Sequence, residues 1–347
     1  MEQSSLTAKE TFFELLNLYP SPHNGQPMML RKVSNDEGVE RYDVLFQTDR
    51  GLSATSISYL FSYVTVGLFV EYARYCAEAA GVKISFAMDL PRQQHMADLG
   101  ALRLGKMTIE SQNSIPNREL ETVLRFRQTS RKKYHQGLRA ESIQKLTEWH
   151  KTSPIQVLFL GDTEAAETIW LNQRAVFDDM FDTNVREELK KWLRFSHKEK
   201  LAKKDGLSYD CMELSGPALR FFVKYYRIIR LPIFAQILRK YYLRTMTDKS
   251  TVLYMRAPFA TEQNAFDIGT AMLKMWIEVS RQGAYLHPFG TIVSNLEAHR
   301  DFLELTHIQE ENIDENYVVF ICRAGYSDLP VRSERIPSTE HLIKAED

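Results

Sequence analysis

The spacing of apolar residues predicts a mixture of helices and short strands along the chain. Residues 9–18 place Phe12, Phe13, Leu15, Leu16 and Leu18 on one broad helical face. Runs of strand length, apolar or alternating, are bounded by charged or turn residues. They cover residues 42–49, 82–88, 155–161, 251–255 and 317–325. Longer helical patterns separate them, so the sequence predicts an α+β protein.

The same order of elements occurs twice. Residues 12–30 and 142–161 both read as a helix, a turn and an apolar run. Residues 57–80 and 265–282 both read as long, aromatic-rich core helices, and each is followed by a glycine at the C-cap position and an extended run. We expect a duplicated unit, with residues 1–120 as the first repeat and residues 121–347 as the second. Chance recurrence of a common pattern is the alternative.

One uncharged stretch requires a test for membrane insertion. Residues 51–70 are long enough to span a bilayer and carry no charge. Serine and threonine hydroxyls fill the first half, and their transfer into lipid is unfavourable. The pattern therefore favours a buried central helix.

The composition describes an ordinary globular protein. Its 347 residues are 44% hydrophobic and 26% charged, with a formal net charge of -1. This balance predicts no nucleic-acid partner. Cys76, Cys211 and Cys322 are far apart and lack metal-site spacing, so we expect reduced thiols and no metal, with a catalytic thiol as the alternative. The N-terminus lacks the apolar core of a secretory signal, and we expect a cytoplasmic protein.

A basic, aromatic segment interrupts the second half. Residues 190–244 contain fourteen Lys or Arg and four acids. Arg220, Lys224 and Arg227 share one helical face, with Phe and Tyr around the rest, and Pro232 is expected to break the helix. The favoured interpretation is a surface helix pair whose aromatic side packs on the core. The alternatives are a face that binds anionic lipid and a lid over a phosphate-bearing ligand.

Three polar clusters carry the candidate chemistry. The connection "LYPSPHNGQPMML" at residues 18–30 holds more side-chain amides than a turn requires. "LRFRQTSRKKY" at residues 124–134 offers two guanidinium groups and two hydroxyls, which suit a phosphate. "RAGYSDLPVRSERIP" at residues 323–337 adds two more arginines. The sequence has no Walker loop, GxGxxG after a strand, HExxH, CxxC or GxSxG motif.

Together these clusters resemble the FMN-dependent nitroreductase superfamily. Residues 20–27, "PSPHNGQP", are similar to its PSxxNxQP loop, and residues 127–131, "RQTSR", with Tyr134 beyond, are similar to its RxSxR segment. "HPFG" at residues 287–290 stands where the family has a turn with proline and glycine. Arg332 and Arg335 are similar in place to its basic pair near the end of the fold. The order of the motifs and "WLRFSHKEKLAKKDGL" at residues 192–207 resemble the fused two-repeat, Acg-type branch. Met28, where tryptophan is usual, and the basic insert depart from the pattern.

The resemblance implies a nitroreductase-like fold of two fused repeats, with mixed or antiparallel sheets, long central helices and one FMN. Asn24 and Gln26 would present amides to the flavin, Ser21 would shape the loop, and Arg127, Arg131 and Arg335 would hold the phosphate. The complete implied cofactor-binding set is Ser21, His23, Asn24, Gln26, Arg127, Thr129, Ser130, Arg131, Gly290, Arg332 and Arg335. No catalytic side chain is implied, because the chemistry occurs on flavin N5.

The resulting hypothesis is an FMN-dependent oxidoreductase that passes a hydride from NADH or NADPH to an electron-poor small molecule. A flavin-sequestering protein with little turnover and an FMN-dependent oxidase or dehydrogenase of a biosynthetic pathway are the alternatives. The segment at about residues 190–250 is the candidate lid. The chain would be a monomer with an intramolecular pseudo-dimer, or a homodimer, and membrane-surface binding is disfavoured. One FMN per chain is expected, because "EWHKTSPIQ" in the second half has no NxQ.

Overall fold

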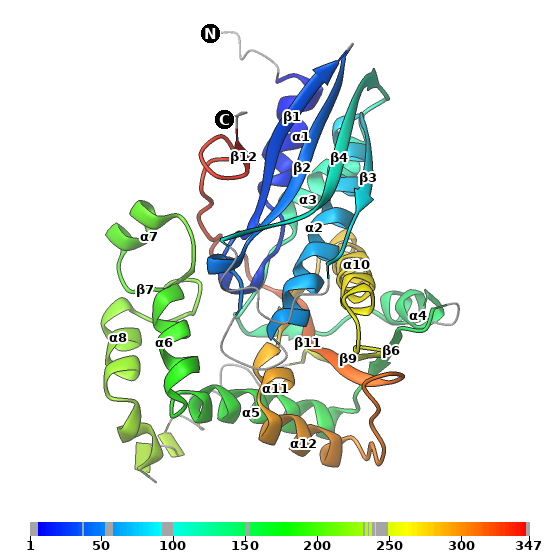
Figure 1. Ribbon diagram of the computed structural model, residues 1–347. Coiled ribbons are helices and arrows are strands. Elements are labelled where there is room, and N and C mark those ends of the chain that lie inside the picture. The colour runs from blue at the N-terminus through cyan, green and yellow to red at the C-terminus, as the bar shows by residue number, and fades with distance from the viewer. Residues whose placement is uncertain are drawn as a thin grey trace.

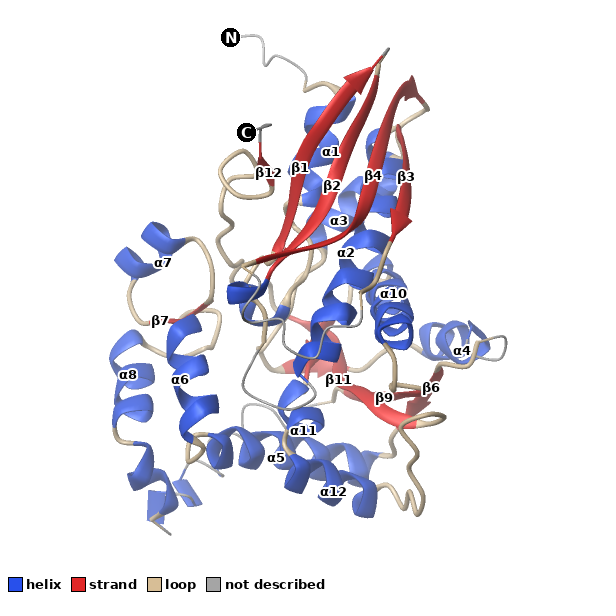
Figure 2. Ribbon diagram, in the orientation of Figure 1, coloured by secondary structure: helices blue, strands red, loops and turns tan. Residues whose placement is uncertain are grey.

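A computed structural model describes residues 6–36, 38–52, 58–91, 100–149, 153–231, 233, 234, 236, 237, 240 and 249–344. One sheet occupies the upper part of the view in Figure 1, the other lies in the lower part, and a pair of long helices runs between them (Figures 1 and 2). Most of the apolar core lies around these two helices.

The first half of the chain forms a sheet with the strand order β12-β1-β2-β4-β3. Strands β1 to β4 pair antiparallel, and helix α2 lies between β2 and β3 in the sequence. Helix α1 begins at a capping box in which Thr7 and Glu10 bond each other's backbone, and its apolar face is buried. The elements of this half are α1 (Ala8–Leu16), η1 (Pro22–Asn24), β1 (Met28–Asp36), β2 (Val39–Gln47), η2 (Thr48–Arg50), α2 (Ser58–Ala80), β3 (Val82–Met88) and β4 (Ala101–Asn113).

The second half repeats this topology. Its sheet has the order β6-β9-β11-β10, again with antiparallel neighbours, and α10 lies in the chain between β9 and β10 as α2 lies between β2 and β3. The elements are α3 (Arg118–Phe126), β5 (Tyr134–Gln136), α4 (Ala140–Trp149), β6 (Gln156–Phe159), β9 (Thr251–Ala257), α10 (Glu262–Arg281), β10 (Tyr285–Pro288), α11 (Gly290–Ser294), α12 (Leu296–Leu305) and β11 (Tyr317–Ser327). The predicted α+β class, with antiparallel sheets and long central helices, is confirmed.

The two central helices cross at a pair of glycines. A Cβ on Gly67 of α2 would lie 2.0 Å from the carbonyl oxygen of Phe266, and one on Gly269 of α10 would lie 2.0 Å from that of Val64. Each glycine thus meets the residue three positions before the other. This reciprocal contact is the arrangement expected of a two-fold related helix pair, and only glycine allows the backbones to approach so closely.

The predicted strands are present, and the sequence patterns missed others. All five predicted runs correspond to strands, namely β2, β3, β6, β9 and β11. The 13-residue strand β4 was not predicted, because charged and hydroxyl side chains interrupt its apolar residues. Both glycines predicted as helix caps, Gly81 and Gly283, have φ of 72°.

A long insertion separates β6 from β9, whereas the equivalent strands β1 and β2 are joined by a hairpin. The insertion contains α5 (Asp162–Asp179), α6 (Thr183–Trp192), β7 (Leu193–Arg194), α7 (His197–Lys203), β8 (Leu207–Ser208), α8 (Gly216–Lys224) and η5 (Tyr226–Arg230). Its α6–α8 part lies to one side of both sheets (Figure 1). A small separate core holds this part together, with Met180, Leu193, Leu219 and Val223 at its centre.

The packing of α8 differs from the favoured sequence interpretation. The side chains that reach the core are Leu219 and Val223, while Phe221 and Tyr225 are each 43% exposed. The helix ends at Lys224, earlier than expected, and Pro232 lies outside the described residues. The prediction that the aromatic side packs inward is therefore wrong for these two residues, because the aliphatic positions of the helix take the inner face.

The C-terminal segment returns to the first sheet. After β11 the chain runs up the side of the molecule, and β12 (Ile343–Lys344) pairs parallel with β1 through Leu30 and Ile343 (Figure 1). Residues 328–342 therefore pass close to the polar loop at residues 20–27. Among the described residues, no helix is long and apolar enough to cross a membrane, and α2 is the buried central helix that the sequence predicts.

Candidate functional site

The polar loop at residues 20–27 has an unusual backbone. His23, Asn24 and Gln26 all have positive φ, at 50°, 53° and 53°. Non-glycine residues rarely adopt this left-handed conformation. Three of them within four positions cost free energy unless the surrounding structure holds them in place. The Ser21 hydroxyl accepts a hydrogen bond from the backbone amide of Gln26 at 3.0 Å, which closes the loop.

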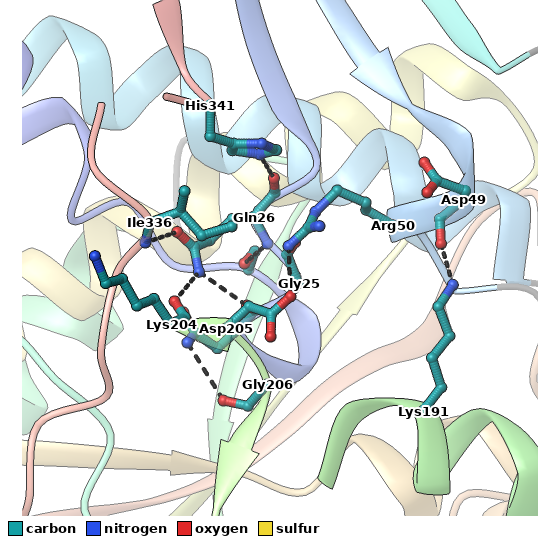
Figure 3. A network of polar contacts seen from close by, with 12 residues as sticks. Gly25, Gln26, Asp49, Arg50, Lys191, Lys204, Asp205, Gly206, Ile336 and His341 are labelled. Atoms are coloured by element: carbon teal, nitrogen blue, oxygen red, sulfur yellow. Dashed lines mark hydrogen bonds and ion pairs between the residues drawn. The ribbon is translucent and has the colours of Figure 1, made fainter. Parts of the chain in front are cut away.

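The two amide side chains of this loop bond other parts of the chain. Gln26 Nε2 donates to the Lys204 carbonyl at 3.0 Å, and Gln26 Oε1 accepts from the Ile336 amide at 3.1 Å (Figure 3). Asn24 Nδ2 donates to the carbonyls of Gly206 and Glu334 at 3.3 and 3.0 Å. The loop is thus held between the insertion and the C-terminal segment, two regions far away in sequence.

An ion-pair network fastens the insertion to this loop. Asp205 accepts from Arg194 at 2.5 and 3.1 Å and from Arg50 at 2.8 Å. Arg50 also donates to the Gly25 carbonyl at 2.7 Å (Figure 3). The Trp192 ring lies over the same place, 3.4 Å from where a Cβ of Gly25 would be. The residues of the W-R…DGL segment therefore contact the PSxxNxQP-like loop directly. The sequence patterns did not identify Arg50 as a contact of this loop. The one feature that could have drawn attention to it is its place directly after a predicted strand.

A second group of arginines lies close to the loop without carboxylate partners. Arg127 is only 4% exposed; its Nη2 donates to the Leu18 carbonyl at 2.9 Å, and its guanidinium stacks 4.8 Å from the Trp276 ring. Burial, followed by the charge of Arg127, lowers the pKa of Arg335 to about 10. The charge of Arg332 also acts on both. Within the described residues, no ion pair involves Arg127, Arg332 or Arg335.

Arg131 belongs to a different positive cluster. Its Nη1 donates to the Cys211 carbonyl at 3.4 Å, and its backbone carbonyl accepts from the fully buried Arg323 at 3.1 Å. Arg323 also donates to His287 Nδ1 at 3.2 Å. Burial, then the charges of Arg323 and Arg131, hold the pKa of His287 well below its usual range. Burial, then the charge of Arg131, lowers the pKa of His23 to about 4.

The remaining predicted residues lie around these two clusters. Thr129 forms a parallel bridge with Leu286, and the buried Ser130 hydroxyl shares a hydrogen bond of 2.7 Å with Ser327. Gly290 is exposed at the start of α11. The structure thus places Arg127, Arg332 and Arg335 together, whereas Arg131 contacts Arg323 and Cys211. The backbone and hydroxyl of Ser130 bond other parts of the protein.

Unsatisfied buried polar atoms concentrate in the predicted motifs. Among the described residues, Arg127 Nε and Arg335 Nη1 are buried donors with no hydrogen-bond partner, and the buried atoms His23 Nδ1, Asn24 Oδ1 and Gln128 Oε1 have none either. Buried polar groups are normally paired, since an unpaired one costs about 1–3 kcal/mol. Two buried guanidinium donors without an acceptor fit an anion such as a phosphate, and the loop atoms fit polar ring edges, so the residues present fit FMN.

Space beside the loop is small. A cavity of about 10 Å³ lies next to Arg50 and is lined by Pro22, Pro27, Phe46, Phe61 and Ser62, among others. Such a volume holds about one water molecule. A ring system could reach the Asn24 and Gln26 amides only if the insertion or the C-terminal segment moved away from them.

Cys76 and Cys322 offer no activated nucleophile. All three cysteines are free and buried, and burial raises the pKa of Cys76 and of Cys322 well above the usual thiol value. Cys211 contacts the Ser333 hydroxyl and the Val331 carbonyl at 3.5 and 3.6 Å.

No family model matches the chain, and no curated protein matches it. Among solved structures, the FMN-dependent nitroreductase NfnB from Mycobacterium smegmatis, in complex with NADPH, is similar over 64% of this chain and 96% of its own, at 16% identity and a TM-score of 0.40.

Proposed function

We propose that this chain is an FMN-binding oxidoreductase of the nitroreductase type, which passes a hydride from NADH or NADPH through FMN to an electron-poor small molecule. The observation that carries the proposal is that two buried donors, Arg127 Nε and Arg335 Nη1, have no acceptor among the described residues and lie beside the strained amide loop. The motif resemblance supplies the identity of the cofactor.

In this proposal the residues position and shield the cofactor. Arg127 and Arg335 hold the phosphate with charge-assisted hydrogen bonds. Asn24 Oδ1 and His23 Nδ1 provide polar partners for the flavin edge, and His23 serves as a neutral group because its pKa is about 4. The insertion, fastened through Asp205, excludes water from this side. When bound, the flavin itself supplies the hydride chemistry.

Flavin storage is the second candidate function. The observation in its favour is that Lys204, Gly206, Glu334 and Ile336 already bond the loop amides. If these contacts re-form over a bound flavin, only a fraction of the molecules admit a nicotinamide. The apparent dissociation constant of NADPH then rises by the inverse of that fraction.

The test is purification of the full chain followed by FMN titration. We expect a yellow protein, or a colourless one that takes up FMN and quenches its fluorescence, and weaker binding of FAD. Anaerobic stopped-flow mixing with NADH and NADPH then separates the two functions: fast bleaching supports the oxidoreductase, and stable yellow colour supports storage. A protein that takes up no FMN would overturn both.

We also propose that residues 1–120 and 121–347 correspond to two repeats that share one flavin. The repeated strand order and the reciprocal glycines of α2 and α10 support this division. The site combines the loop of the first repeat with Arg127 and Arg335 of the second. A measured stoichiometry of one FMN per chain is expected, and two per chain would contradict the proposal.

A further inference from the structure

Large apolar side chains are exposed in one short part of the insertion. Phe221, Tyr225 and Leu231 are 43%, 43% and 53% exposed, and three more follow within six residues. The complete set is Phe221, Tyr225, Leu231, Ile233, Phe234 and Ile237, which we call the apolar rim. Single exposed apolar residues are ordinary, but a concentrated group marks an interaction surface.

The rim lies within a stretch that contains cations and no acids. Residues 214–247 have seven Lys or Arg and not one Asp or Glu. Arg220, Lys224 and Arg227 are all exposed, and among the described ion pairs only Arg220 has a partner, Glu199 at 3.6 Å. The unneutralised cations and the exposed apolar side chains therefore share one short stretch of the chain, residues 220–237.

We propose that the apolar rim and its cations form a docking surface for an anionic phospholipid bilayer. Exposed aromatic and aliphatic side chains enter the headgroup region, while Lys and Arg bind the lipid phosphates and carboxylates. A second copy of the chain is a poorer occupant, since a two-fold contact through this surface would bring equal positive charges together. The α8 helix lies at the side of the molecule, away from both sheets, which leaves a bilayer room to approach (Figure 1).

The surface can dock without disturbing the candidate site. The inner side chains of α8, Leu219 and Val223, pack in the small core of the insertion, and among the described members of that core there is no rim residue. Removal of rim side chains therefore leaves the core and the Asp205 network intact.

The test is co-sedimentation of the full chain with vesicles of phosphatidylcholine alone or with about one third phosphatidylserine. We expect binding only to the anionic vesicles, and weaker binding at higher salt. A lysine near the surface contributes about 1 kcal/mol, so Lys224→Gln should weaken partitioning about fivefold. Phe221→Ser should also weaken it, whereas the control variants Arg300→Gln on α12 and Leu296→Ser should bind like the parent protein.

Other outcomes would overturn the proposal. These are equal binding to both kinds of vesicle, binding to neither, or unchanged binding by Lys224→Gln and Phe221→Ser. Light scattering after size-exclusion chromatography provides the last check. A dimer that Phe221→Ser converts to a monomer would assign the surface to a second copy of the chain instead. A circular dichroism spectrum equal to that of the parent excludes misfolding of the variants.

Discussion

Two groups of arginines lie beside the same loop and have opposite surroundings. Arg50 and Arg194 share the carboxylate of Asp205, and Arg194 uses its remaining donors on the carbonyls of Lys191 and Leu193. Arg127 is buried and Arg335 is partly buried, yet within the described residues they have no carboxylate and keep unpaired donors. The first group shares a carboxylate, and the second has none.

The difference separates a structural role from a binding role. A buried charge that is paired and hydrogen-bonded fixes the insertion against the loop. A buried charge without a partner lowers the stability of the protein alone, so its retention is best explained by an anion that it binds. Residue type and burial are the same in both groups; the position of one aspartate makes the difference.

The largest effect is expected for Asp205→Asn. This change leaves Arg194 and Arg50 without an anion in a buried setting, which costs about 3–5 kcal/mol. Urea unfolding should show the loss, and limited proteolysis should cut the insertion faster. The matched control is Asp36→Asn, whose ion pair with Arg41 is exposed and should contribute less than about 1 kcal/mol. Equal costs for the two variants would contradict a structural role for Asp205.

The next effect concerns Arg127. In Arg127→Met the affinity for FMN should fall about 10- to 100-fold, which corresponds to the loss of a charge-assisted bond of about 1.5–3 kcal/mol. Arg127→Lys should retain only part of the affinity for FMN, because lysine lacks the forked pair of donors of arginine. Without FMN, Arg127→Met should lose far less stability than Asp205→Asn.

Fluorescence titration with FMN, and urea unfolding without it, measure the two quantities. Arg118→Met, at an exposed side chain on α3, is the control and should change neither. If Arg127→Met binds FMN like the parent but unfolds as easily as Asp205→Asn, the arginine is structural and the comparison fails.

The last prediction concerns the pH dependence of stability. The pKa of His23 is about 4 and that of His287 is well below its usual range, so between about pH 6.5 and 4 these two histidines bind more protons in the unfolded chain than in the folded one. Stability should therefore decrease as the pH falls through this window and level off below the folded pKa values. His287→Gln should flatten the profile, as thermal unfolding at several pH values would show.

The same profile can locate the phosphate. An anion at the Arg131 cluster would raise the pKa of His23 and His287 and make the FMN-bound profile shallower. An anion held by Arg127 and Arg335 would shift the curve upward with a smaller change in slope. This measurement shows which of the predicted arginines hold the phosphate, Arg131 on the one hand or Arg127 and Arg335 on the other.

Local patterns in the sequence determined the elements and the chemical types. Apolar spacing identified helix α1 and five strands, and glycines after long helices marked the ends of α2 and α10, because these features depend on neighbours along the chain. The clusters with Asn24, Gln26, Arg127 and Arg335 could also be recognised, since amides and guanidinium groups are visible in any fold. Strand β4 escaped because its polar residues mask the alternation.

Only the tertiary structure decided which of these groups meet. It brought Asp205 to Arg50, and Ile336 and Lys204 to Gln26, across 155 to 310 positions of the chain. It also left Arg127 and Arg335 without a carboxylate and turned Phe221 outward. A charge run and a charge cluster look alike in a sequence, because the cost of a charge depends on the water and the counter-charges around it. Those are fixed by packing between distant segments.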